Sequence, residues 1–85
     1  MNEFTGFGER VRTAADLGTV TRKRRREQNL TQEDLALLVA SHRNRIQEVE
    51  QGISTERLEL LLRIMNELGL DLIVRPRDAH RGANR

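Results

Sequence analysis

The segment LTQEDLA at residues 30–36 constrains the fold of this chain more than any other feature. Thr31 is placed to cap a helix, because its hydroxyl can accept a hydrogen bond from a free backbone N–H of the first turn. Asp34, three residues later, stands where a capping box carries its acidic side chain. Apolar residues then recur on one face, which predicts a short helix over residues 32–39.

A second short helix is predicted over residues 43–50, after a brief turn at residues 40–41. Its apolar residues Ile46 and Val49 lie three positions apart, and Gly52 is placed to end the helix. Two short helices joined by a tight turn form a helix-turn-helix, whose second helix can enter the major groove of DNA. The pattern therefore predicts a DNA-binding domain as well as a helical fold.

A longer helix is predicted before this pair. Thr13 and Asp16 repeat the capping-box spacing, which predicts a helix over residues 14–28. Residues 1–12 precede it, contain both phenylalanines and are interpreted as an N-terminal arm.

The fourth predicted helix begins after a cap at Ser54 or Thr55 and ends at Gly69. Its apolar residues form a main stripe, expected to face the core, and a second stripe on the flank. A domain of this size has trouble covering both stripes. The main stripe comprises Leu58, Leu61, Leu62, Met65 and Leu68, and the flanking stripe comprises Leu60 and Ile64.

Residues 70–75 are predicted to form a β-strand that Pro76 ends, and residues 76–85 to form a basic, flexible tail. Apart from the N-terminal arm, which is a weak candidate, nothing else in the chain looks able to pair with this strand. An unpaired edge invites another chain, so we expect the strand to pair antiparallel with its own copy in a homodimer. The alternative is an extended tail packed on its own domain. The predicted dimer interface comprises Leu60, Ile64, Leu70, Leu72, Ile73 and Val74, within a domain spanning residues 13–75.

Composition excludes several classes of protein. The 85 residues suit one small domain, and the absence of cysteine excludes disulfides and thiolate metal sites. His42 and His80 lie far apart and lack a ligand set or a catalytic relay, so we predict no metal, no cofactor and no enzymatic activity. Without a membrane-length apolar run or a signal peptide, we expect a cytoplasmic, nucleoid-associated bacterial protein.

The net charge of +2 is mild, and its distribution is more informative. Residues 22–26 are five consecutive cations, whereas residues 43–51 mix two arginines with two glutamates. Only the first cluster is typical of an electrostatic anchor for phosphate. Five consecutive cations wrap round a helix, so any single one of them either meets DNA or faces water.

Together these residues resemble the Xre/Cro family of phage-repressor-like helix-turn-helix domains, over residues 17–70. The best-matching positions are Arg22, Arg25, Leu30, Thr31, Gln32, Leu35, Ala36, Ile46, Glu50 and Gly52. The last helix and the strand after it look more specifically like the HipB-type antitoxins of type II toxin–antitoxin systems. The resemblance implies a mainly α fold of four to five helices, with one C-terminal β-strand pairing across a homodimer.

In function, the resemblance implies a repressor that binds near-palindromic double-stranded operator DNA, autoregulates its operon and neutralises a HipA-like kinase toxin. Two alternatives stay open. One is a phage or restriction-modification regulator without a toxin, and the other is a protein-interaction module with weak DNA binding.

The resemblance also implies roles for individual residues. Base contacts are expected from the early, groove-facing positions of the recognition helix: His42, Arg43, Asn44, Gln47 and Glu48. Arginine can bond bidentately to guanine, and asparagine to adenine, so Arg43 and Asn44 are the leading base readers. Backbone contacts are expected from Arg22, Thr31, Gln32, Arg45 and Gln51. Arg25 and Glu50 match a family ion pair that is mainly architectural.

The turn departs from the family pattern, because Ala40 and Ser41 stand where glycine and an apolar residue are common. Alanine is costlier than glycine in a left-handed conformation. Either His42 or Ser41 caps the recognition helix, and the choice moves its start by one residue. Leu37 and Leu38 stand where polar residues are usual. They are either extra core, the interpretation we favour, or a surface for a partner protein.

Overall fold

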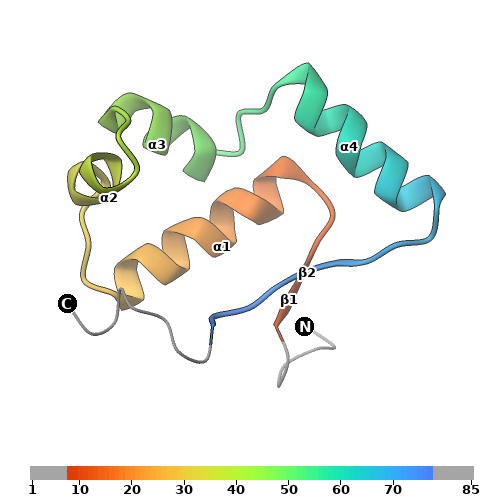
Figure 1. Cartoon of the computed structure of the whole chain (residues 1–85), viewed down its shortest axis with the longest axis horizontal. Coiled ribbons are helices and arrows are strands. Elements are labelled where there is room, and N and C mark those ends of the chain that lie inside the picture. Colours follow the sequence, from red (N-terminus) through yellow and green to blue (C-terminus); the bar gives the residue numbers. More distant parts are fainter. Residues whose placement is uncertain (1–7, 78–85) are drawn as a thin grey trace.

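The computed structural model describes residues 8–77, which form four helices and two short strands (Figure 1). In chain order the elements are β1 (Glu9–Val11), α1 (Ala14–Glu27), α2 (Gln32–Leu38), α3 (Arg43–Glu50), α4 (Glu56–Glu67) and β2 (Leu72–Val74). The predicted mainly helical fold is confirmed. Phe4, Phe7 and His80 lie outside the described residues, as does the part of the predicted tail over residues 78–85.

Short polar side chains start the helices where the sequence predicts. Thr13 and Thr31 each accept a hydrogen bond from the backbone N–H three residues on, at 3.1 and 3.0 Å. Asp16 and Asp34 return the bond to the cap backbone, so both predicted capping boxes are present. Thr55, rather than Ser54, caps α4.

The four helices within residues 8–77 end in the same way. The residue after each C-cap has a positive φ. Its own backbone N–H and that of the following residue donate to carbonyls near the end of the helix, as in a Schellman motif. These left-handed residues are Asn29, Ala40, Gly52 and Gly69. Asparagine and glycine tolerate this conformation, whereas alanine is strained in it by its Cβ. The expected strain at Ala40 is therefore present, with φ at 56°.

Helix α1 packs against α3 at almost backbone contact. A Cβ on Gly18 would collide with the carbonyl oxygens of Val49 and Glu50, so glycine is required where the two helices meet. The buried apolar side chains of the described residues are Val11, Ala14, Ala36, Ile46 and Leu62. This core is small, and it lies between α1, α2, α3 and one residue each of β1 and α4.

The strand prediction needs correction in both extent and partner. The strand covers Leu72–Val74 rather than residues 70–75, and it pairs antiparallel with β1 of the same chain. In this register Val11 faces Leu72 and Glu9 faces Val74. Residues 9–11, assigned to an N-terminal arm from the sequence, therefore belong to the folded domain. The edge of β2 that lies beside β1 is therefore paired within the chain and not across a homodimer.

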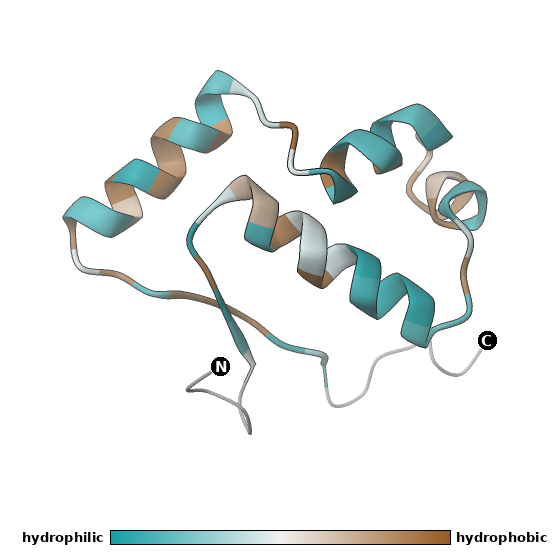
Figure 2. Cartoon of the chain, turned by 180° about the vertical axis from the view of Figure 1, so that it is seen from behind, coloured by the Kyte–Doolittle hydropathy of each residue, from teal (hydrophilic) through white to brown (hydrophobic). Residues whose placement is uncertain are grey.

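Helix α4 carries several apolar residues, brown in Figure 2, that the other described residues leave exposed. Of the main apolar stripe predicted to face the core, Leu62 is buried, whereas Leu61 and Leu68 are exposed, Leu68 by 66%. Leu60 and Ile64 on the flanking stripe are exposed too. The stripe was misjudged because α4 packs less closely against the other described elements than α1, α2 and α3 pack against one another, so that Leu62 alone of its residues is buried.

The favoured placement of Leu37 and Leu38 in the core is wrong. Leu37 is 81% exposed, and Leu38 and Val39 are each about half exposed. On helix α2, Ala36 is buried and Leu35 is partly buried, whereas the two leucines that follow lie on the outer side.

Replacing Ala40 with glycine is expected to stabilise the domain by about 1 kcal/mol, because it removes the Cβ strain of the left-handed turn. Thermal unfolding should show this as a rise in Tm of roughly 4–8 °C for a domain of this size. Asn29→Gly is the matched control, since Asn29 has φ 59° but tolerates it better. Equal gains at both positions would contradict the assignment of strain to Ala40.

Candidate nucleic-acid interface

A buried ion pair joins α1 to the end of α3. The Arg25 Nε donates to Oε2 of Glu50 at 2.6 Å, and a terminal nitrogen donates to Oε1 at 3.0 Å. The two side chains are only 8% and 3% exposed. The other terminal nitrogen of Arg25 donates to the carbonyl of Leu30 at 2.8 Å. One guanidinium therefore holds α3 and the loop before α2 together, and the ion pair expected between these residues is present.

Gln32 extends this network from the first turn of α2. Its amide nitrogen donates to Oε1 of Glu50 at 3.0 Å. Hydrogen bonds from Arg25 and then Gln32 hold the pKa of Glu50 below its ordinary value, despite burial, and the charges of Arg25 and Arg22 act in the same direction. The hydrogen bond to Glu50 likewise raises the pKa of Arg25. Both groups are therefore charged at neutral pH, and Gln32 lies against the carboxylate.

This network orients the exposed side of α3. At about 100° per residue, Arg43, Gln47 and Gln51 form one line along the helix, with Asn44 and Glu48 beside it. Ile46, on another side, is buried against the domain. The five polar side chains thus share one outward face, which the short recognition helix can present to a groove.

A hollow of about 560 Å³ lies beside this face, between the end of α1, the start of α2 and α3. Its cationic lining comes from Arg22, Arg25, Arg26 and Arg43, and Thr31, Gln32, Gln47 and Gln51 also line it. Arg25 is committed to Glu50, so the accessible cations are the other three. The surface suits a polyanion such as a DNA backbone.

The structure brings together most of the residues predicted to contact DNA. Arg43 and Gln47 share the hollow with the predicted backbone contacts Arg22, Thr31, Gln32 and Gln51. His42, Asn44, Glu48 and Arg45 are exposed on α3 or at its cap but do not line the hollow. His42, not Ser41, is the N-cap, and its side chain makes no capping hydrogen bond within the described residues. The helix therefore begins at Arg43.

Arg26 is the residue that the sequence interpretation did not single out. It lines the hollow together with Arg22, four positions earlier on α1. That spacing places two side chains on one face of a helix. The sequence of the cationic tract could therefore have predicted that Arg26 lies beside Arg22. Lys23 and Arg24 point elsewhere and pair with Glu9 and Glu27.

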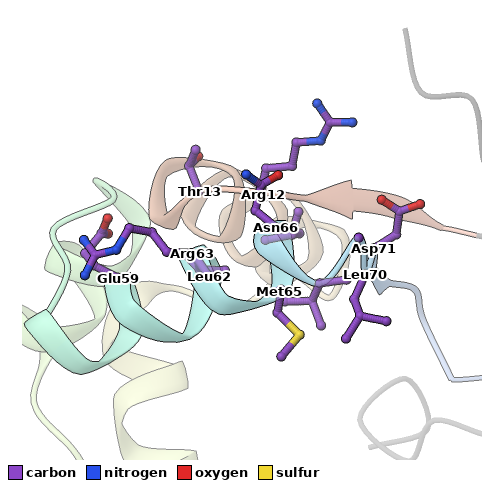
Figure 3. Close-up of a pocket in the computed structure, with 12 residues that line it drawn as sticks. Arg12, Thr13, Glu59, Leu62, Arg63, Met65, Asn66, Leu70 and Asp71 are labelled. Atoms are coloured by element: carbon purple, nitrogen blue, oxygen red, sulfur yellow. The ribbon is translucent and has the colours of Figure 1, made fainter.

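A second hollow, of about 460 Å³, separates α4 from the start of α1 and from β2 (Figure 3). Leu62, Met65 and Leu70 supply apolar lining, while Arg12 and Asp71 lie among its polar residues. This mixture of side chains does not indicate a particular class of ligand. The hollow is best explained by the loose packing of α4 against the other described elements. No helix within residues 8–77 is long and apolar enough to cross a membrane.

Comparison with known proteins agrees with this geometry. Residues 22–74 match the family model HTH_3, described as helix-turn-helix. The uncharacterized HTH-type transcriptional regulator y4mF of Sinorhizobium fredii (strain NBRC 101917 / NGR234) is 33% identical over 66 residues, which are 78% of this chain and 87% of that protein. No solved structure matches the chain.

Glu50→Gln is expected to destabilise the domain by about 3 kcal/mol, because it leaves the buried Arg25 charge without its partner. Since the pKa of Glu50 is lowered by folding, the carboxylate stabilises the native state above its ordinary value of 4.5. That contribution is lost as the pH falls from there through the lowered pKa. Urea unfolding between pH 7 and pH 3 should therefore show a weaker pH dependence for the variant.

Glu48→Gln is the control, because Glu48 is an exposed glutamate on the same helix. It should change the free energy of unfolding by no more than about 0.5 kcal/mol. A comparable loss in both variants would mean that the ion pair is not what holds α3 in place.

Proposed function

This chain belongs to the Xre/Cro-type helix-turn-helix family of DNA-binding domains, and on that premise we propose that it is a dimeric, sequence-specific transcriptional repressor. We further propose that it is the antitoxin of a toxin–antitoxin operon. The family assignment agrees with the prediction that the chain is not an enzyme. The observation that carries the proposal is the outward polar face of α3 beside a cationic hollow.

In the proposed complex, α3 enters the major groove and its first turn reads bases. Arg43 has the geometry for a bidentate bond to guanine, and Asn44 and Gln47 have it for adenine. Glu48 can accept from the amino group of cytosine, and His42 lies at the entry to the helix. The start of α3 at Arg43 supports this register.

Phosphates are proposed to lie along the hollow and its rim. Arg22 and Gln51 line it, and Thr31 lies at the start of α2. Gln32 uses one amide hydrogen on Glu50, which leaves the second hydrogen for a phosphate oxygen. Arg45 lies off the base-reading face of α3 and is proposed to reach the backbone of the adjacent strand. These contacts position the protein without specifying sequence.

Dimerisation is proposed because the domain leaves much apolar surface uncovered. Besides Leu60, Ile64, Leu70 and Leu72 from the predicted interface, Leu61 and Leu68 are also exposed. Ile73 and Val74 are half-buried in the two-stranded sheet. A surface of this kind on a small domain is typical of a protein-protein interface. Two recognition helices related by a two-fold axis would then enter successive major grooves, about 34 Å apart.

The antitoxin role is supported by the order of α4 and β2, which resembles the HipB-type antitoxins. It is also supported by the patch of Leu37, Leu38 and Val39 on the outer side of α2 and its turn. None of these three side chains lines the hollow beside α3, so we propose that a protein could contact the patch while DNA is bound. The proposed partner is a HipA-like kinase toxin.

Arg43→Ala is expected to weaken operator binding by about 1–3 kcal/mol and to relax the preference at one base pair per half-site. Fluorescence anisotropy with the region upstream of the gene, and with single base-pair changes in it, measures both effects. Unchanged affinity and unchanged specificity would show that the proposed register of α3 is wrong.

Arg22→Ala is the matched comparison, because its proposed partner is a phosphate. It should weaken operator and random duplexes alike, and it should reduce the slope of log K against log salt by about 0.9 for each phosphate that is no longer neutralised. Arg24→Ala, at a cation paired with Glu27, should leave that slope unchanged.

The double variant L37S/L38S is expected to abolish co-purification with the proposed toxin, while operator affinity stays within about twofold because neither leucine lines the hollow beside α3. Co-expression followed by affinity capture measures the first effect. If no kinase-like protein is captured by the unaltered chain, the chain is a regulator without a toxin. If only sequence-indifferent DNA binding is found, it is a protein-interaction module.

A further inference from the structure

The hollow beside α3 collects cations that the fold leaves without an ion-pair partner. In the cationic tract of α1, three side chains pair with carboxylates, and the other two, Arg22 and Arg26, line the hollow. Arg43, the first residue of α3, lines it as well. Within residues 8–77, none of these three arginines lies in an ion pair. Positive charge is thus concentrated in one concave part of the surface.

The remaining charges of the lining do not cancel this concentration. Arg25 and Glu50 neutralise each other at 2.6 Å, and Glu33 is the one lining carboxylate outside this pair among the described residues. Three arginines against one carboxylate leave the side chains of the lining with a net charge of +2. Cations that lie together in a concave surface repel one another, and a bound anion would relieve that repulsion.

Neutral hydrogen-bond donors lie among the three arginines. Gln32 retains one amide hydrogen beyond the one that it gives to the buried carboxylate, and Gln47 and Gln51 also line the hollow. The Thr31 hydroxyl accepts a backbone hydrogen bond at 3.0 Å, so its own hydrogen is left to donate. Arginine binds phosphate oxygens through charge-assisted, often bidentate bonds. The lining therefore offers several donors to an anion with many oxygens.

The volume of the hollow, about 560 Å³, suits a small molecule as well as a segment of DNA backbone. Small-molecule sites commonly enclose about 300–1,000 Å³. Directly linked phosphates carry several negative charges within a few bond lengths, whereas a sugar separates the phosphates of a DNA strand. A short polyphosphate can therefore contact the arginines of α1 and α3 together.

We propose that the hollow binds a short polyphosphate, of the kind present in inorganic tripolyphosphate and in nucleoside triphosphates, and that this anion competes with operator DNA. Arg22, Arg26 and Arg43 hold the phosphate chain between α1 and α3. Arg43 is also a proposed base reader and Arg22 a proposed phosphate contact, so the anion and the operator cannot occupy the site together. The competition rests on the proposed repressor function, whereas the binding site rests on the side chains of the hollow alone.

Isothermal titration calorimetry of the full chain with tripolyphosphate, in magnesium-free buffer at constant ionic strength, tests the binding site. We expect one anion per chain. Arg26→Ala should weaken the binding by about tenfold or more, because a charge-assisted contact is lost. Arg26 is exposed, so the variant should fold as the unaltered chain does.

Arg24→Ala is the matched control for this loss of charge. It removes one cation from the same helix, but Arg24 pairs with Glu27 and does not line the hollow. The affinity for tripolyphosphate should change by no more than about twofold, because exposed charges away from the site are screened. Equal losses in the two variants, or binding without a defined stoichiometry, would mean that the anion responds to net charge alone and would overturn the site.

A comparison of inorganic phosphate, tripolyphosphate and ATP identifies the recognised group. Inorganic phosphate should bind at least about tenfold more weakly than tripolyphosphate, because it reaches fewer of the three arginines. Equal affinities for ATP and tripolyphosphate would show that the phosphate chain is recognised by itself, and tighter binding of ATP would show that the nucleoside contributes as well. Inorganic phosphate that binds as tightly as tripolyphosphate would overturn the assignment to a polyphosphate.

Fluorescence anisotropy with labelled operator tests the competition. Tripolyphosphate should displace the operator from the unaltered chain and from Arg24→Ala at similar concentrations. For Arg26→Ala, the inhibition constant, corrected for the operator affinity of the variant, should rise by about tenfold or more. Sodium sulfate at the same ionic strength controls for screening.

The outcomes separate this inference from the proposed function. A chain that binds its operator, but that tripolyphosphate displaces no better than sulfate does, overturns the competition and leaves the repressor standing. A chain that binds no operator overturns the proposed function, and the calorimetry then still decides whether the hollow binds the anion.

Discussion

The ion pair between Arg25 and Glu50 is the interaction on which the rest of the structure depends. Its two charges are almost fully buried, so each requires the other. Because Arg25 also binds the carbonyl of Leu30 and Glu50 also binds Gln32, the pair joins α1, the loop before α2, α2 itself and α3. The orientation of the polar face of α3 follows from this junction.

Close approach of α1 and α3 makes that junction possible. Gly18 allows the end of α3 to lie almost against the backbone of α1, which brings Glu50 within reach of Arg25. The geometry also explains why Arg25 is unavailable to DNA although it lies in a run of five cations. Of that run, Arg22 and Arg26 are the other two cations that line the hollow.

The half of the described chain that contains α4 and β2 leaves more of its apolar surface exposed. Helix α4 contributes one buried residue, Leu62, and leaves a broad apolar surface exposed within the described residues. A domain of 85 residues has a small core, so such exposure costs stability unless something covers it. The half of the described chain that contains the helix-turn-helix is thus held together by the buried ion pair, whereas the half that contains α4 leaves apolar side chains exposed.

The sequence by itself determined the features that depend on neighbours in the chain. Helix starts at Thr13 and Thr31, and the ends at Gly52 and Gly69, follow from hydrogen bonds between residues at most five apart. The pairing of Arg25 with Glu50 was predicted from the resemblance to the Xre/Cro family. Only the tertiary structure decided that β1 pairs with β2 and that Leu37 and Leu38 are exposed. Strand pairing joins residues some sixty positions apart, and burial depends on where whole helices pack, so neither is encoded in local spacing.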